Sequence, residues 1–148
     1  ELLRTMAITA VPEQQLNYAL ALVDCPDPER HDPAAAIAAV RDPALEPLYP
    51  QAGAIIEVIA RVRLADWQGA HDALAKHDVK TEFLVLTPQA VHFLRALIYH
   101  HLGRTDAARE CHARGVEAWS LVAGSDHTAW QHSDLQRWRT AAEQAMGL

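Results

Sequence analysis

The sequence predicts an all-α domain, and three observations lead to that fold class. Of the 148 residues, 28 are alanine, the strongest helix former, whereas valine plus isoleucine number 16 and threonine 7. Apolar residues recur with helical spacing between prolines and glycines that mark helix ends. Half of the residues are hydrophobic and 22% are charged, which suffices for one folded domain with a core.

The first helical pair is predicted over about residues 12–42. Its first helix begins near Pro12, carries apolar residues at helical spacing, and stops at the Cys25-Pro26-Asp27-Pro28 stretch. Asp32 is the predicted N-cap of the second helix and Pro33 its first residue.

The second pair is predicted over about residues 51–78, with a turn at Ala65-Asp66 between its helices. Residues 78–88 are less regular, and periodicity leaves a helix end and an extended stretch equally open. The third pair is predicted over about residues 88–121, with Thr87-Pro88 as its start signal and Gly103 at its turn. Residues 120–132 are interpreted as an insertion.

Ser133 is the predicted N-cap of a last helix over about 133–147, which Gly147 terminates.

The three pairs share small residues at equivalent positions. In the second helices, Ala36, Ala70 and Ala108 are separated by 34 and then 38 residues. Equivalent positions in the first helices hold Ala19, Val58 and Ala96. Two antiparallel helices approach closely only where small side chains lie at the crossing, so these positions predict three similar hairpins.

On these residues the chain resembles the tetratricopeptide repeat family. The third pair matches best, through Ala96, Tyr99, Leu102-Gly103 and Ala107-Ala108, whereas Ala65 replaces the turn glycine in the second pair. Asn17-Tyr18-Ala19-Leu20 and the proline-rich stretch after it resemble repeats from C-terminal arrays of planctomycete-type bacterial proteins. The resemblance implies a single domain over 1–148, a right-handed superhelix of three repeats with a capping helix.

The resemblance also implies a binding function, because the first helices of such repeats line a concave groove. Carried over position by position, the groove is mostly apolar, with basic groups at one edge. Its predicted residues are Leu16, Leu20, Val23, Ile55, Ile59, Val62, Arg63, Phe93, Leu97, His100 and His101. Such a groove suits an apolar peptide or an amphipathic helix. The alternative is that these residues are core, covered by other parts of the protein.

No catalytic or cofactor motif accompanies the repeats. The nine histidines lack the i, i+3 or i, i+4 pairs typical of helical metal sites, and adjacent Cys111 and His112 point about 100° apart on a helix. Glu57, Asp66, Asp72 and Glu82 are interpreted as solvated charges and caps. We therefore expect no enzyme, no metal and no cofactor, and a His- or metal-dependent hydrolase is the least favoured alternative.

The charge of the chain restricts its expected partners, and its cysteine content indicates the compartment. The formal net charge of −6, from 19 acidic and 13 basic residues, argues against a nucleic-acid or anionic-membrane binder. No apolar run approaches the roughly 20 residues of a membrane span. Cys25 and Cys111 form no CxxC motif, which favours a reducing, cytoplasmic compartment and leaves a periplasmic location as the alternative. The opening Glu1 is no initiator Met, which leaves open a targeting segment or a larger protein upstream.

The leading hypothesis is a protein-interaction module, and its rival is a structural subunit whose groove is permanently covered. A free groove predicts that Phe93→Glu and Leu97→Glu abolish partner binding and leave stability nearly unchanged. Loss of folding in these variants would favour the structural role.

Overall fold

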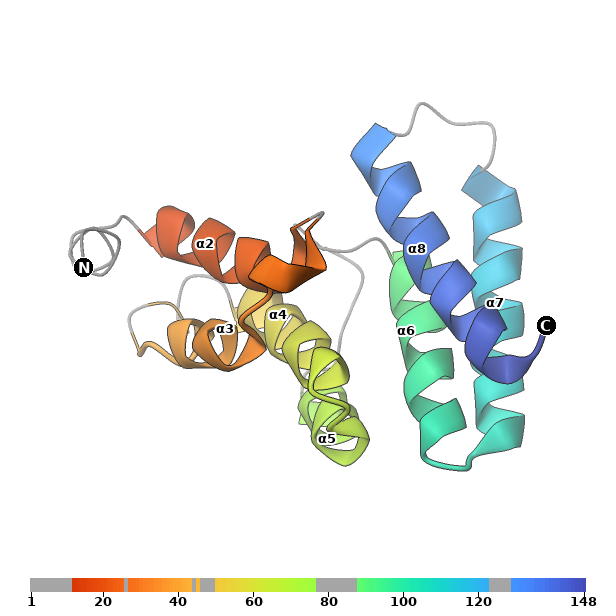
Figure 1. The fold of residues 1–148 in the computed structure, drawn as a ribbon. Helices are drawn as coiled ribbons and strands as arrows, with labels where there is room; N and C mark the ends of the chain where they lie inside the picture. The colour runs from red at the N-terminus through yellow and green to blue at the C-terminus, as the bar shows by residue number, and fades with distance from the viewer. Residues whose placement is uncertain (1–11, 26, 44, 46–49, 77–87, 123–128) are drawn as a thin grey trace. The chain divides into compact units, whose positions relative to one another are not determined.

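The computed structural model describes residues 12–25, 27–43, 45, 50–76, 88–122 and 129–148. These residues form α-helices and one short 3-10 helix, with no strand among them, which confirms the all-α class (Figure 1). The α-helices are α2 (Pro12–Asp24), α3 (Pro33–Val40), α4 (Pro50–Arg63), α5 (Trp67–Lys76), α6 (Pro88–His101), α7 (Thr105–Val122) and α8 (Ala129–Met146). The 3-10 helix η1 spans Pro28–Arg30. Within this part of the chain, no helix is both long and apolar enough to traverse a bilayer.

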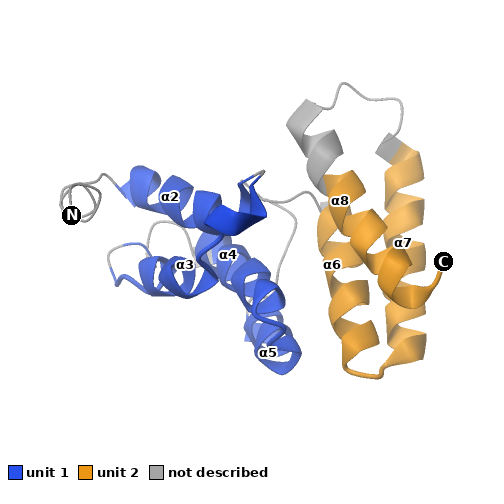
Figure 2. Ribbon diagram, viewed as in Figure 1, with its two compact units in different colours: residues 1–79 blue, residues 80–148 orange. Residues whose placement is uncertain are grey.

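The chain divides into two compact units, residues 1–79 and residues 80–148 (Figure 2). In unit 1, α2 packs on α3, α4 packs on α5, and α4 also contacts both α2 and α3. In unit 2, α6 packs against α7 and against α8. Each of the three predicted helical pairs is therefore a packed hairpin.

Small residues lie at the centre of every hairpin. Ala19, Val58 and Ala96 in the first helices are fully buried, and so are their counterparts in the second helices. Those counterparts are Ala36, Ala70 and Ala108. Burial at all six positions is what the predicted register requires, because a larger side chain at a crossing would push the two helix axes apart.

In the first pair, proline and aspartate residues mark the ends of the helices. Helix α2 stops at Asp24, immediately before the proline-rich stretch. The Asp32 carboxylate accepts a hydrogen bond from the Ala35 amide at 3.0 Å, and Pro33 is the first residue of α3, as predicted. The short helix η1, capped by Asp27, occupies the longer connection and was not predicted.

The turns of the second and third hairpins share one geometry. Ala65 has a φ of +55° and Gly103 has a φ of +73°. In both turns this residue's amide donates to the carbonyl three residues back, at 3.0 Å. The next amide donates to the carbonyl five residues back, at 2.9 Å after Ala65 and 2.8 Å after Gly103. This pair of hydrogen bonds is the Schellman motif that ends helices, and Gly147 ends α8 in the same way, as predicted.

The prediction that Ser133 caps the last helix is wrong, because α8 begins at Ala129 and Ser133 lies inside it. No proline or glycine separates Ala129 from Met146, and alanine and glutamine near its start favour helix, so nothing stops the helix from extending. The predicted insertion is thus partly helical at both ends, since α7 also continues to Val122. The predictions for residues 78–87, the Thr87 start signal and the middle of the predicted insertion fall outside the described residues.

Candidate interaction surface

Most of the residues predicted to line a groove are part of the hydrophobic core. Seven of the eleven have an exposed fraction of 9% or less. They are Leu16, Val23, Ile55, Ile59, Val62, Phe93 and Leu97. Leu20 and His100 are half-buried, whereas Arg63 and His101 are exposed. The exposed side chains of this set are therefore the basic Arg63 and His101, and the apolar residues other than the half-buried Leu20 are buried.

The accessible basic residues lie at the C-terminal ends of the first helices. Arg63 ends α4, and His100 and His101 end α6. Basic side chains are favourable there because the helix dipole places partial negative charge at this end. The Arg63 guanidinium donates to the carbonyl of Val23 at 3.3 Å, which connects the end of α4 to the end of α2.

The two neighbouring histidines of α6 contact each other edge to face, with ring centroids 5.4 Å apart. Burial, together with the nearby His100, lowers the pKa of His101 below its ordinary value. Both effects disfavour the protonated imidazole, so this end of α6 carries less positive charge at neutral pH than two histidines suggest.

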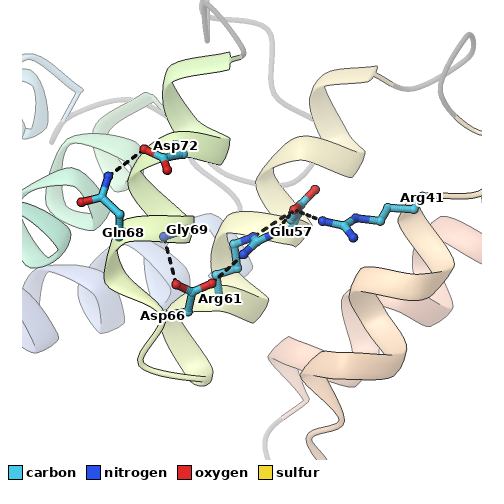
Figure 3. A network of polar contacts seen from close by, with 7 residues as sticks. All are labelled: Arg41, Glu57, Arg61, Asp66, Gln68, Gly69 and Asp72. Carbon is cyan, nitrogen blue, oxygen red and sulfur yellow. Dashed lines mark hydrogen bonds and ion pairs between the residues drawn. The ribbon is translucent and has the colours of Figure 1, made fainter.

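A polar network joins α3, α4 and α5 (Figure 3). The same oxygen of Glu57 accepts hydrogen bonds from Arg41 at 3.0 Å and from two nitrogens of Arg61 at 2.9 and 2.8 Å. Arg61 also donates to one oxygen of Asp66, and the other oxygen accepts from the Gly69 amide at 3.0 Å, which caps α5. We call Arg41, Glu57, Arg61 and Asp66 the α3–α5 network.

The network keeps Glu57 ionised although the residue is partly buried. Burial alone would raise the pKa of Glu57, but the hydrogen bonds and positive charges of Arg61 and Arg41 outweigh it and lower the pKa below its ordinary value. The sequence analysis placed both Glu57 and Asp66 among solvated charges and caps. Asp66 does cap α5, whereas Glu57 joins two arginines, a role that the sequence did not indicate. Its arginine partners lie four and sixteen residues away, and only the four-residue spacing is visible in the sequence.

A second polar contact joins α7 to α8. His112 Nε2 lies 3.1 Å from an oxygen of Glu143, which also accepts from Arg139 at 2.8 Å. The His112 ring meets the ring of Phe93 edge to face, with centroids 5.5 Å apart. Hydrogen bonds from Arg139 and His112 lower the pKa of Glu143 despite some desolvation.

Cys111 and His112 lie in different surroundings, as expected because the side chains of neighbouring helix residues point in different directions. Cys111 is half-buried, and burial raises the pKa of its thiol, so the nucleophilic thiolate is disfavoured. Across the described residues, no three His, Cys, Asp or Glu side chains lie close enough together to hold a metal ion. His77 and His127 lie outside those residues, so metal analysis of the purified protein tests the metal hypothesis.

Comparison of the chain with protein-family models, with curated proteins and with solved structures gave no significant match.

Proposed function

We propose that this chain is a non-enzymatic protein-interaction module, built as a helical repeat of the tetratricopeptide type. One observation supports the proposal most: two hairpins related by a 38-residue offset have the same Schellman turn and bury small residues at equivalent positions. Repeated hairpins of this kind stack into extended surfaces that bind proteins or peptides. The superhelical arrangement and the relation to that family are part of the proposal.

The binding surface we propose is narrower than an apolar groove. Since seven of the predicted groove residues are buried, we place the partner at the C-terminal end of α4. There Arg63 is exposed beside Leu64, which is 50% exposed. An exposed leucine next to a cation suits a partner segment with an apolar residue and a carboxylate.

Paired variants test this surface. We expect Leu64→Glu, on an exposed side chain, to leave the melting temperature within a few degrees and to abolish partner binding. Arg109→Glu is the matched control, because Arg109 is exposed on α7, a second helix. Partner capture from the native organism, followed by quantitative binding of the purified partner, gives the measurement. Equal binding by the two variants would contradict the proposed surface.

A structural role is the second candidate, since the predicted groove residues are covered in the structure, as that role requires. In this role the chain is a permanent subunit or domain of a larger assembly. It then co-purifies with its partner at fixed stoichiometry through high salt, whereas an interaction module exchanges its partner. Sedimentation of the native complex in low and high salt distinguishes the two roles.

The proposal includes a cytoplasmic location. The two cysteines, Cys25 and Cys111, are both unpaired thiols in the structure, which suits a reducing compartment. Fractionation of native cells tests it.

A further inference from the structure

We draw no further inference here: the strongest candidate, a shallow hollow along one face of α8 that is lined by Gln136, Arg137, Thr140, Ala141 and Gln144, lies on an open helix face, and nothing in the structure shows what covers it.

Discussion

The hairpins α4/α5 and α6/α7 make the same turn with different side chains. In α4/α5, the guanidinium of Arg61 reaches forward five residues to the carboxylate of Asp66. At the equivalent positions of α6/α7, the Arg104 guanidinium lies over the ring of Tyr99, 5.8 Å from its centroid. One turn is thus stabilised by an ion pair and the other by a cation–π contact. The arginine precedes the turn in α4/α5 and follows it in α6/α7.

The two hairpins also differ in the helix residue that lies next to each of these side-chain contacts. A Cβ on Gly69 would overlap an Asp66 oxygen and an Arg61 nitrogen, so the ion pair occupies the space that a side chain at this position would need. The equivalent residue in α6/α7 is Ala107. The backbone hydrogen bonds of the turn are therefore the constant part of the hairpin, and the side chains that brace it are interchangeable.

The largest effect is expected in the cores of the two hairpins. Phe93 and Ile55 occupy equivalent positions and are both fully buried. Truncation to alanine should lower the free energy of unfolding by about 3–5 kcal/mol for Phe93→Ala and about 2–5 kcal/mol for Ile55→Ala. Urea denaturation followed by circular dichroism measures both.

The Phe93→Ala variant also tests whether the Phe93 ring belongs to the core or lines an open groove. A loss below about 1 kcal/mol in Phe93→Ala would mean that this ring is not core and would restore the open apolar groove. By the same reasoning Phe93→Glu should unfold the protein, so it cannot serve as a test of binding.

Of the two most crowded helical glycines, Gly69 and Gly115, we expect the more crowded Gly69 to tolerate alanine better. A Cβ on Gly115 would lie 2.9 Å from the Phe93 ring, which the core holds in place, whereas the atoms that crowd Gly69 are ends of flexible side chains. We expect Gly115→Ala to destabilise by about 1–2 kcal/mol, and Gly69→Ala by less than about 1 kcal/mol, because the loss of bracing is offset by better helix propensity. Thermal unfolding of both variants checks the ranking, and a larger loss in Gly69→Ala would contradict it.

Acid should weaken the α3–α5 network. The α6/α7 hairpin has Arg95 at the position equivalent to Glu57 and therefore lacks this carboxylate. The folded-state pKa of Glu57 lies below its ordinary value of 4.5. The carboxylate therefore stabilises the fold fully above pH 4.5, and this contribution is lost as the pH falls through the lowered pKa.

Glu57→Gln is the matching variant, and it should cost roughly 1–2 kcal/mol at pH 7 by weakening charge-assisted hydrogen bonds. Urea midpoints at pH 6 and pH 3 should show a smaller acid-induced loss in the variant than in the wild type. Glu143→Gln serves as a control in unit 2, where the pKa of the carboxyl is also lowered. Equal acid sensitivity of wild type and Glu57→Gln would show that the network does not depend on the Glu57 charge.

Much of the fold could be predicted from the sequence because local chemistry determines it. Prolines and aspartates position the starts of the helices, as at Asp32, and the 38-residue offset aligns Ala70 with Ala108. The start of α8 was missed because Ser133 has the chemistry of a cap yet follows residues that continue the helix. Local preference alone does not decide which of several permitted starts is used.

The candidate site was less predictable, for a physical reason. Helical periodicity shows that Ile55 and Ile59 lie on an apolar face of α4 and that Phe93 lies on an apolar face of α6, but it does not show whether protein or solvent covers either face. The contact between Arg41 and Glu57 depends on tertiary packing of α3 against α4, as does the contact between His112 and Glu143 on α7 and α8.

The equivalence of the two turns is the central claim, and an exchange of their turn residues tests it most directly. Ala65 adopts a left-handed φ that disfavours a Cβ, and a Cβ on Gly103 would meet no atom within 4 Å, so conformation alone sets the cost at both sites. We predict that Ala65→Gly raises, and Gly103→Ala lowers, the free energy of unfolding by roughly 1 kcal/mol each, measured by urea denaturation. Changes of the same sign in the two variants would contradict the claim that the hairpins share one turn.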